Sequence, residues 1–537
     1  MVHFPHAART ASMAQAASRG AREPGTMLRI GALLEHWADH RPDGLAVVCG
    51  AERLDWRSLH QRVHRCANVL QSLGLRQGDR LAVMLPNGLP LLELYRAAAT
   101  LGLGLVPLSP LLQAAGLAAL LRDARVAALV HHAPLRALVE AARDGMAGVP
   151  MPRTIEVGGD GAAADACYEA LLAAAPARRL PVAPVDEQDL CHLMYSSGTT
   201  GLPKGIVLTQ RIRALYALLF ATRFRIDADS VVLHAGSLVF NGAFVTLMPA
   251  WLQGCPYVLL ERFDAAALVE AVRRERATHV ILVPSQIAAL LQAPNLDRDA
   301  LSSLRMVCSL GAPLPLQHKR ALLELLPDAV YELYGLTEGF VTVLDARDCA
   351  AHAESVGVPL PWSALRIVGP DGADLPPGAV GEIVGRGPLL TPGYYGRPDL
   401  TAEALVDGWL HSGDLGYVDA QGYLHLVDRA KDLIISGGVN VYPRDVEEVA
   451  ATHPRVREAA VFGVPDPAWG ERPVAALVLR EGAAEDAAAL CEWINARVAA
   501  RYQRLREVVV LEALPRNIAG KTLKRELRER WLAARAP

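Results

Sequence analysis

The run Tyr195-Ser-Ser-Gly-Thr-Thr-Gly-Leu-Pro-Lys-Gly205 is the part of the sequence best suited to bind phosphate. Its glycines expose backbone N–H groups, its serines and threonines supply O–H donors, and Lys204 adds a positive charge. It differs from a Walker A loop, in which serine or threonine follows the lysine, because Lys204 is followed by Gly205. The pattern indicates a polyphosphate-binding loop, although an ordinary solvent-exposed loop has a similar composition.

Four other clusters combine carboxylates, hydroxyl groups and cations in short stretches. They lie at residues 331–338, 412–416, 428–443 and 515–521. Taken singly, each has a structural explanation: a strand end, an aspartate in a turn, a charged linker with a glycine-rich turn, and a basic surface loop. Their order and spacing along one chain carry more information than any single cluster.

Together the five clusters resemble the motifs of the adenylate-forming superfamily, which contains acyl-CoA synthetases, luciferases and the adenylation domains of peptide synthetases. The resemblance extends over nearly all of residues 27–526. The run Ser436-Gly-Gly-Val-Asn-Val-Tyr-Pro443 is more similar to the fatty- and aryl-CoA ligases than to the amino-acid domains. The resemblance implies that the protein activates a carboxylate with ATP.

The resemblance also implies which residues contact ATP. The β- and γ-phosphates would be held by Ser196, Ser197, Gly198, Thr199, Thr200, Gly201 and Lys204. The adenine slot would consist of Gly311, Ala312, Pro313, Tyr334 and Gly335. Thr337 would contact the α-phosphate, and Glu338 would hold Mg²⁺, which takes one or two carboxylates when it bridges phosphates. Asp414 would accept hydrogen bonds from the ribose hydroxyls, and Arg429 would donate to the same sugar.

Lysine is rare in this chain, which uses arginine for most of its positive charges. The five lysines are at positions 204, 319, 431, 521 and 524. By the resemblance, Lys521 is the catalytic lysine, which bridges the attacking carboxylate and the α-phosphate as charge builds up. Lys431 falls at the domain hinge of the family, and the loop facing CoA would contain Ser436, Gly437 and Gly438. Three of the five lysines thus occupy motif positions, which supports the assignment independently.

The acyl pocket is implied to use a segment without charged side chains. Between Val231 and Leu260 there is no Asp, Glu, Lys or Arg, which is also what a buried strand and helix would show. The candidate lining is Val239, Phe240, Asn241, Gly242, Leu310 and Phe340. The ammonium group of an amino acid would lack a counter-charge here, so an apolar acid is favoured. Three departures from the family pattern are Val239 or Phe240 at the acyl gate, Leu310 before Gly311, and Asp445 instead of glutamate.

The elements that must position these groups alternate β-rich apolar runs with helical periodicity, which is typical of a mostly parallel sheet covered by helices. Buried strands are expected at 80–85, 126–130, 231–234, 279–283, 306–310 and 330–333, and a helix at 59–73. After residue 428 the pattern predicts a compact α+β domain, with helices at 441–452 and 485–502 and strands at 459–464 and 474–479. The fold class is therefore α/β, a large multi-sheet body followed by a small C-terminal domain.

This organisation predicts an N-terminal ATP- and acyl-binding domain over 27–428, a hinge at 429–431, and a mobile C-terminal domain with the catalytic lysine over 432–537. Residues 1–26 contain three arginines and no acidic residue before Glu23, a composition that superficially suggests a transit peptide. We interpret them as a disordered tail or the product of an upstream start codon.

Composition excludes several classes of function. With a formal net charge of −3 over 537 residues, no global field attracts nucleic acid or an anionic membrane. The eight cysteines are dispersed, without a CxxC motif, which indicates reduced thiols and a cytoplasmic protein. The apolar stretch 101–121 is interrupted by Pro107 and Pro110, so it is interpreted as strand, turn and helix instead of a membrane span.

The resulting hypothesis is a carboxylate–CoA ligase that forms an acyl-adenylate, with ATP, Mg²⁺ and coenzyme A as cofactor and co-substrates. Its substrate would be an apolar carboxylic acid, either fatty, alicyclic or aromatic. Three alternatives are an acyl-adenylate ligase that loads a carrier protein, an amino-acid adenylating enzyme, and an inactive nucleotide-binding relative. The presence of Lys521 and Glu338 argues against the inactive form. A hydrolase or zinc protease is disfavoured because neither GxSxG nor HExxH occurs.

Overall fold

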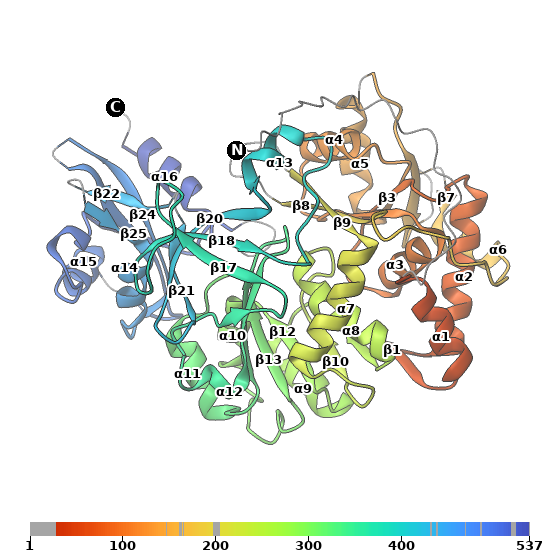
Figure 1. The fold of residues 1–537 in the computed structure, drawn as a ribbon, viewed down its shortest axis with the longest axis horizontal. Helices are drawn as coiled ribbons and strands as arrows, with labels where there is room; N and C mark the ends of the chain where they lie inside the picture. The colour runs from red at the N-terminus through yellow and green to blue at the C-terminus, as the bar shows by residue number, and fades with distance from the viewer. Residues whose placement is uncertain are drawn as a thin grey trace, which may run out of the picture.

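The computed structural model describes residues 28–535, except 147, 160–163, 165, 197–203, 430–431, 437–438, 468, 484–485 and 517–521. The predicted tail at 1–26 therefore lies outside the described residues. Within them the chain forms four β-sheets surrounded by helices (Figure 1). The predicted α/β multi-sheet body with a separate small C-terminal domain is confirmed.

The first part of the chain builds a seven-stranded sheet whose strands are parallel except at one edge. In spatial order its strands are β7 (Ala166–Cys167), β6 (Arg153–Val157), β5 (Ala128–His132), β3 (Arg80–Met84), β4 (Gly104–Pro107), β8 (Leu190–Ser196) and β9 (Lys204–Thr209). The antiparallel pair β8–β9 closes the sheet, and Ser196 pairs with Lys204. The predicted phosphate loop is therefore the connection of a β-hairpin.

The nine-stranded sheet is parallel in its centre, as expected for strands that read as continuous apolar runs. Its strands are β16 (Val358–Pro359), β15 (Val341–Leu344), β14 (Val330–Gly335), β13 (Met306–Leu310), β12 (His279–Leu282), β10 (Val232–His234), β11 (Tyr257–Leu259), β1 (Leu45–Cys49) and β2 (Glu52–Asp55). The expected strands of both sheets are confirmed, with ends that shift by a few residues. The stretch 101–121 forms strand β4 and the start of a helix, as predicted.

Helices cover the two sheets and fill the space between them. They are α1 (Ala32–His40), α2 (Trp56–Ser72), α3 (Leu89–Leu101), α4 (Ala114–Asp123), α5 (Arg136–Asp144), α6 (Tyr168–Ala174), α7 (Gln210–Phe224), α8 (Phe244–Gln253), α9 (Ala265–Glu275), α10 (Pro284–Leu290), α11 (Leu316–Leu325) and α12 (Ala346–Cys349). The largest core cluster joins side chains of both sheets, such as Val83 and Tyr257, to Phe220 of α7 and Phe244 of α8. Through these two helices, the two sheets share one hydrophobic core.

An antiparallel sheet and the C-terminal domain complete the described chain. The antiparallel sheet contains β17 (Ala364–Val368), β18 (Gly381–Arg386), β20 (Trp409–Val418), β19 (Leu405–Val406) and β21 (Leu424–Arg429), with α13 (Pro398–Ala404) beside it. The C-terminal domain contains β23 (Val439–Val441), β22 (Ile434–Ser436), β25 (Gly470–Leu479), β24 (Val456–Asp466) and β26 (Val508–Leu511), with α14 (Pro443–Ala451), α15 (Ala487–Asn495) and α16 (Lys524–Ala533). In Figure 1 this domain is the blue region at the left.

Two helix boundaries in this domain differ from the prediction. Helix α14 begins at Pro443, because proline is favoured in the first turn, and Val441 belongs to strand β23. Helix α15 ends at Asn495 instead of residue 502. The Asn495 amide donates to the carbonyl of Leu505 at 3.1 Å and accepts from the N–H of Leu505 at 2.7 Å. A side chain that bonds to the backbone in this way favours the end of a helix.

No helix in the described ranges has both the length and the apolar character needed to span a bilayer.

Candidate active site

The predicted adenine slot lies where two parallel strands end side by side. Leu310 at the end of β13 pairs with Leu333 of β14, so Gly311 and Tyr334 follow at the same edge of the sheet. Gly311 has a φ of +91°, a conformation that side chains rarely adopt. A crevice beyond the carboxyl ends of parallel strands is the usual ligand site of open α/β sheets. The structure thus brings together both walls that the sequence assigned to adenine.

The predicted ribose-binding pair is in contact with the same slot. Asp414 on β20 and Arg429 on β21 are direct cross-strand neighbours, and Arg429 Nε lies 3.3 Å from Asp414 Oδ1. The hydroxyl of Tyr334 donates to Asp414 Oδ2 at 2.9 Å. Burial, together with the Asp414 charge, raises the pKa of Tyr334 well above its usual value, so its hydroxyl keeps its proton. One carboxylate is therefore held from two sides beside the expected position of a sugar.

Thr337 and Glu338 lie in the tight turn that joins β14 to the antiparallel strand β15. The turn is closed by hydrogen bonds from the N–H groups of Leu336 and Gly339. Gly339 has a φ of +112°, and a Cβ there would lie 1.8 Å from the carbonyl oxygen of Leu389. The neighbouring segment also donates from the N–H of Thr391 to the carbonyl of Glu338 at 2.7 Å. This packing fixes the backbone of the predicted metal ligand.

Tyr394 connects Glu338 with Lys204 and is a residue that sequence reasoning missed. Its hydroxyl donates to Glu338 Oε1 at 2.9 Å, and Lys204 Nζ lies 5.1 Å from its ring centroid. Burial and the Glu338 charge raise the pKa of Tyr394. The contact arises because residues 391–395 run along β9, where the N–H of Tyr395 donates to the carbonyl of Gly205 at 2.7 Å. No motif signals this pairing, which depends on the tertiary fold.

Several predicted site residues lie outside the described residues. They are Ser197, Gly198, Thr199, Thr200, Gly201, Lys431, Gly437, Gly438 and Lys521. The structure nevertheless describes the segments that flank the predicted catalytic lysine. Arg516 and Thr522 form an isolated β-bridge, and the N–H of Leu523 donates to the carbonyl of Pro515 at 2.8 Å. The described residues on either side of Lys521 are therefore paired with each other, and the role of Lys521 stays a prediction.

The candidate acyl segment is held by side chains from α3 and the loop before it. The Asn87 amide donates to the carbonyls of Gly236 and Leu260, and its oxygen accepts from the N–H of Leu238. A Cβ added to Gly242 would lie 2.8 Å from Leu310 Cδ1, so these two predicted lining residues are neighbours. Asn241, Phe240 and Leu310 are partly exposed, whereas Val239 is buried in the main core.

Phe340 lies apart from the other predicted lining residues. Its ring is buried in the cluster of the antiparallel sheet, together with Ile383 and Leu410, and it packs against Gly385. Tyr334 packs against the same cluster. The structure therefore places Phe340 behind the adenine slot, because the β14–β15 hairpin turns this side chain toward the antiparallel sheet.

Arg213 of α7 brings a positive charge to the segment that lacks charged residues of its own. It is fully buried, donates to Asn241 Oδ1 at 2.9 Å and to His192 Nδ1 at 3.2 Å, and lies 4.1 Å from the ring centroid of Phe244. Burial and this guanidinium lower the pKa of His192 well below its usual value, so the imidazole is neutral. Arg213 was not predicted from the sequence, because nothing in the helical pattern distinguishes it from any other arginine of a helix.

The C-terminal domain contacts the end of β21 next to the predicted hinge. The N–H of Arg444 donates to Asp428 Oδ2 at 3.1 Å, and its guanidinium donates to the carbonyl of Leu426 at 2.8 Å. Lys524 pairs with Glu447 at 2.8 Å. Although burial alone would lower the pKa of Lys524, Glu447 and Asp428 raise it, so the ammonium remains charged. The contact of Arg444 with Asp428 and Leu426 is polar, as is usual between domains of one chain, whereas the Lys524–Glu447 pair lies within the C-terminal domain.

Family models match most of the chain. The model described as AMP-binding enzyme matches residues 34–395, and the AMP-binding enzyme C-terminal domain matches residues 445–521. The chain belongs to the AMP-binding enzyme family. The resemblance to adenylate-forming enzymes of the acyl-CoA synthetase type is thus confirmed. The predicted boundaries at 428 and 431 stay predictions.

Curated relatives of this AMP-binding enzyme are similar over almost their whole length. A feruloyl-CoA synthase of an Amycolatopsis species is 38% identical over 91% of this chain and 96% of its own. An indoleacetate–CoA ligase of Aromatoleum aromaticum is 34% identical over 92% and 98%. Since such relatives are CoA ligases, the prediction of an AMP-forming acid–thiol ligase is confirmed at the level of the family.

Solved structures of similar proteins share the arrangement of the AMP-binding enzyme. ATP-bound MatB from Rhodopseudomonas palustris has a TM-score of 0.85 and 30% identity, covering 94% of this chain and 99% of that one. An o-succinylbenzoate CoA synthetase from Bacillus subtilis, in complex with its acyl-adenylate, has a TM-score of 0.82 and 28% identity over 92% and 97%.

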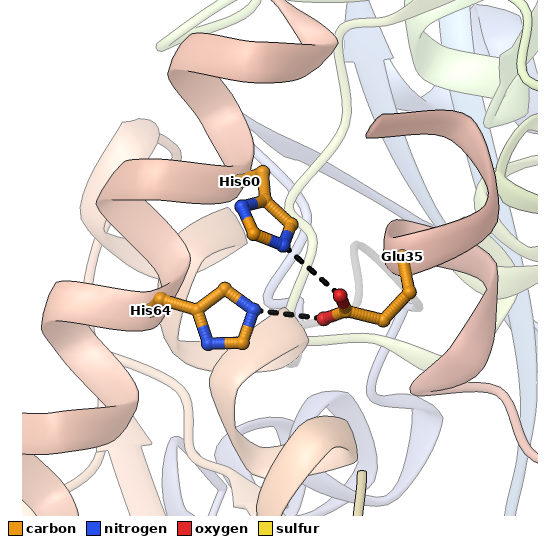
Figure 2. A group of neighbouring side chains, drawn as sticks. All are labelled: Glu35, His60 and His64. Atoms are coloured by element: carbon orange, nitrogen blue, oxygen red, sulfur yellow. Dashed lines mark hydrogen bonds and ion pairs between the residues drawn. The ribbon is translucent and has the colours of Figure 1, made fainter. Parts of the chain in front are cut away.

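A buried cluster of Glu35, His60 and His64 lies away from these motifs, between α1 and α2 (Figure 2). The ring nitrogens Nε2 of His60 and His64 point to the two Glu35 oxygens, at 3.0 and 2.7 Å. His64 Nδ1 accepts from the N–H of Leu180 at 3.1 Å, so its hydrogen is on Nε2. A metal ion would need the lone pair of that nitrogen. We therefore interpret the cluster as a hydrogen-bonded clamp between the two helices.

Replacing Glu35 with glutamine is expected to destabilise the protein at neutral pH. Burial would raise the pKa of Glu35, but hydrogen bonds from His60 and His64 lower it from 4.5 to about 2. Because the pKa of Glu35 is lower in the folded than in the unfolded protein, the ionised carboxylate stabilises the fold by up to about 3 kcal/mol at pH values above the unfolded pKa. This stabilisation is lost as the pH falls toward 2. Urea unfolding should show a deficit of about 2 kcal/mol for Glu35→Gln at pH 7, and a smaller one below pH 4.

Arg179 forms ion pairs with both Glu35 and Asp39, and the Asp39 side chain is 50% exposed, so Asp39→Asn is the matched control for the Glu35 clamp. Surface pairs contribute less than about 1 kcal/mol. An equal deficit in both variants, or a Glu35→Gln deficit that does not change with pH, would show that the clamp does not act through the Glu35 charge.

Proposed function

We propose that this enzyme ligates an aromatic, mainly apolar carboxylic acid to coenzyme A, in two steps through an acyl-adenylate. In the first step a carboxylate oxygen attacks the α-phosphorus of ATP, and pyrophosphate leaves. In the second step the CoA thiolate attacks the acyl carbon, and AMP leaves. The observation that carries the proposal is the joining of Tyr334, Asp414 and Arg429 at the strand ends, with Glu338 in the adjoining turn.

The first half-reaction uses residues that the fold holds in place. Asp414 would accept from the ribose hydroxyls with Arg429 beside it, and Gly311 with Tyr334 would enclose adenine. The residues around Glu338 fit a magnesium ion, because a carboxylate fixed through one oxygen by Tyr394 leaves its other oxygen for a cation. When bound, that ion would neutralise charge on the phosphates. Lys204 supplies a second positive charge near Tyr394.

The second half-reaction is proposed to require a rotation of the C-terminal domain about Lys431. This movement would withdraw Lys521 and bring Ser436, Gly437 and Gly438 toward the thioester site. The contact across the joint supports it, since the hydrogen bonds of Arg444 to Asp428 and to the carbonyl of Leu426 are polar and can be exchanged for water. Hinges are a few residues at the ends of elements, and Lys431 is the second residue after the end of strand β21 at Arg429.

Two features of the acyl segment support an aromatic acid over an amino acid. The guanidinium of Arg213 next to Asn241 would repel an ammonium group, which would also lack a carboxylate partner in this segment. The candidate acyl segment also presents small or apolar surfaces, which come from Gly242 and Phe240 and from the adjacent Leu310. The relatives named for feruloyl and indoleacetate substrates point in the same direction.

Enlarging Gly242 to leucine is expected to exclude the longer or bulkier acids. Because a Cβ at this position already meets Leu310 at 2.8 Å, the added side chain must occupy space on the acyl side. Each methylene that loses its contact costs about 0.8 kcal/mol, so acids longer by three carbons should lose roughly 50-fold in kcat/KM. The measurement is pyrophosphate release over a series of ring-bearing and straight-chain acids.

Leu310→Ala is the opposite control, since it opens the same space and should extend the range to larger acids. A size limit that stays the same in both folded variants would place the acyl pocket elsewhere.

The same panel with and without CoA tests the acceptor. Pyrophosphate release that CoA does not accelerate would favour transfer to a carrier protein, as in a similar fatty acid–[acyl-carrier-protein] ligase of Streptomyces coeruleorubidus.

A further inference from the structure

Arg96 on α3 is a buried guanidinium with no acidic partner. Only 5% of its surface is exposed, and no hydrogen bond or ion pair from its guanidinium occurs among the described residues. The acidic residue nearest in sequence, Glu93, is already paired with Arg62 and with the hydroxyl of Tyr168. An unpaired charge in the interior is costly, so this position needs a physical explanation.

Two indole rings enclose the Arg96 guanidinium. The Arg96 Cζ lies 3.9 Å from the ring centroid of Trp251 and 5.3 Å from that of Trp56. Cation–π contacts stabilise such a charge but leave its N–H groups without acceptors. Burial lowers the pKa of Arg96 only to about 9, so the side chain is positively charged at neutral pH.

A small cavity adjoins the guanidinium and contains a second unpaired polar group. The centre of a water-sized sphere can move within about 10 Å³ of this cavity, so the cavity can hold one small guest such as a water molecule or a monatomic ion. Its walls include Arg96, Trp56, Trp251, Cys255 and Tyr257. Both Arg96 Nη1 and the Tyr257 hydroxyl are buried without a hydrogen-bond partner. The Tyr257 side chain belongs to β11, so the cavity lies between α3 and the edge of the nine-stranded sheet.

The chemistry of the walls favours an anion over water. Arg96 and the indoles can only donate hydrogen bonds, and the remaining wall side chains are apolar apart from the Cys255 thiol and the Tyr257 hydroxyl. A water molecule brings two hydrogens, for which these walls offer few acceptors. A monovalent anion needs only donors and also supplies the missing counter-charge.

We propose that this cavity is a structural binding site for a halide ion such as chloride, held between the Arg96 guanidinium and the Tyr257 hydroxyl. The ion would neutralise Arg96 and join α3 to strand β11 and helix α8. The lining of this site contains none of the residues proposed to contact ATP or to line the acyl pocket. The site therefore acts on the stability of the N-terminal body, and its existence does not depend on the proposed reaction.

Thermal unfolding of the full chain in potassium chloride, bromide or gluconate at constant ionic strength tests the site. Gluconate is too large for the cavity. The melting temperature should rise by about 2 °C or more in either halide and level off as the site fills. Crystals grown with bromide should show an anomalous peak beside Arg96 Nη1. Equal melting temperatures in halide and gluconate, or a bound water only, would overturn the proposal.

Three variants separate this site from general salt effects. Arg96→Met should abolish the halide dependence, because it removes the charge and leaves a side chain of similar length. If that variant does not fold, Tyr257→Phe provides the test, since the loss of one donor should weaken halide binding about five- to tenfold. Arg53→Met on the neighbouring strand β2 removes an exposed arginine and should keep the halide response. A halide response that survives in Arg96→Met, or an unchanged halide affinity in Tyr257→Phe, contradicts the proposal.

Discussion

Lys521→Ala is expected to abolish adenylation while largely sparing thioester formation from supplied acyl-AMP. The lysine is proposed to neutralise charge only in the transition state of the first step, where the carboxylate attacks the α-phosphorus. Losing one such preorganised contact typically costs about 10²–10³ in rate. ATP–pyrophosphate exchange measures the first half-reaction, and conversion of synthetic acyl-AMP to acyl-CoA measures the second.

Lys524→Ala is the matched control for this experiment. Lys524 is three residues away and is paired with Glu447 at 2.8 Å, so its removal tests a loss of positive charge in the same part of the domain. If it has an effect, we expect it to change both half-reactions together through the domain joint. An equal loss of both half-reactions in Lys521→Ala would contradict a role confined to adenylation.

Much of the central fold could be predicted, because parallel strands buried on both faces read as continuous apolar runs. The strands expected at 306–310 and 330–333 from this signal are Met306–Leu310 and Val330–Gly335 in the structure. The adenine slot beside their ends was implied by the family motifs and stays a prediction. The end of α15 was not predictable in the same way. It depends on the contact of Asn495 with Leu505, a residue beyond the helix.

The motif residues of the site could be recognised, but the residues that support them could not. Tyr394 reaches Glu338 only because the segment after β18 returns to β9, far away in sequence. Arg96 and Arg213 read as ordinary helix residues, yet both are buried against the segment that contains no charge of its own. Sequence patterns report which residues are polar, whereas tertiary packing decides what those side chains contact.

Two of the five lysines lie outside the motif positions, and one of them is buried near the predicted adenine slot. Besides the three motif positions, the chain keeps Lys319 and Lys524. Lys319 is buried and paired with Glu332, whose carboxylate also accepts from the N–H of Leu314 at 3.0 Å. This pair ties the loop after Gly311 to strand β14 and so supports the adenine slot from behind. Lys319 had no role in the compositional argument, so its contact with Glu332 is visible only in the structure.

Glu338→Gln is expected to slow adenylation by about 10² or more and to raise the magnesium concentration needed for half-maximal rate. Glutamine keeps the shape of the side chain and an oxygen that can accept from Tyr394, so the turn at Leu336–Gly339 should stay in place. What it loses is the negative charge that a hard cation requires. ATP–pyrophosphate exchange as a function of magnesium concentration gives both quantities.

Tyr394→Phe separates the charge of Glu338 from its orientation. This variant keeps the carboxylate but removes the 2.9 Å hydrogen bond that holds Oε1, so a smaller loss of about tenfold is expected. Thioester formation from supplied acyl-AMP should remain close to normal in both variants, because pyrophosphate and its cation have left by then. If Glu338→Gln keeps the normal magnesium dependence, or if Tyr394→Phe is the more damaged variant, Glu338 is not the metal ligand and acts through its contact with Tyr394 instead.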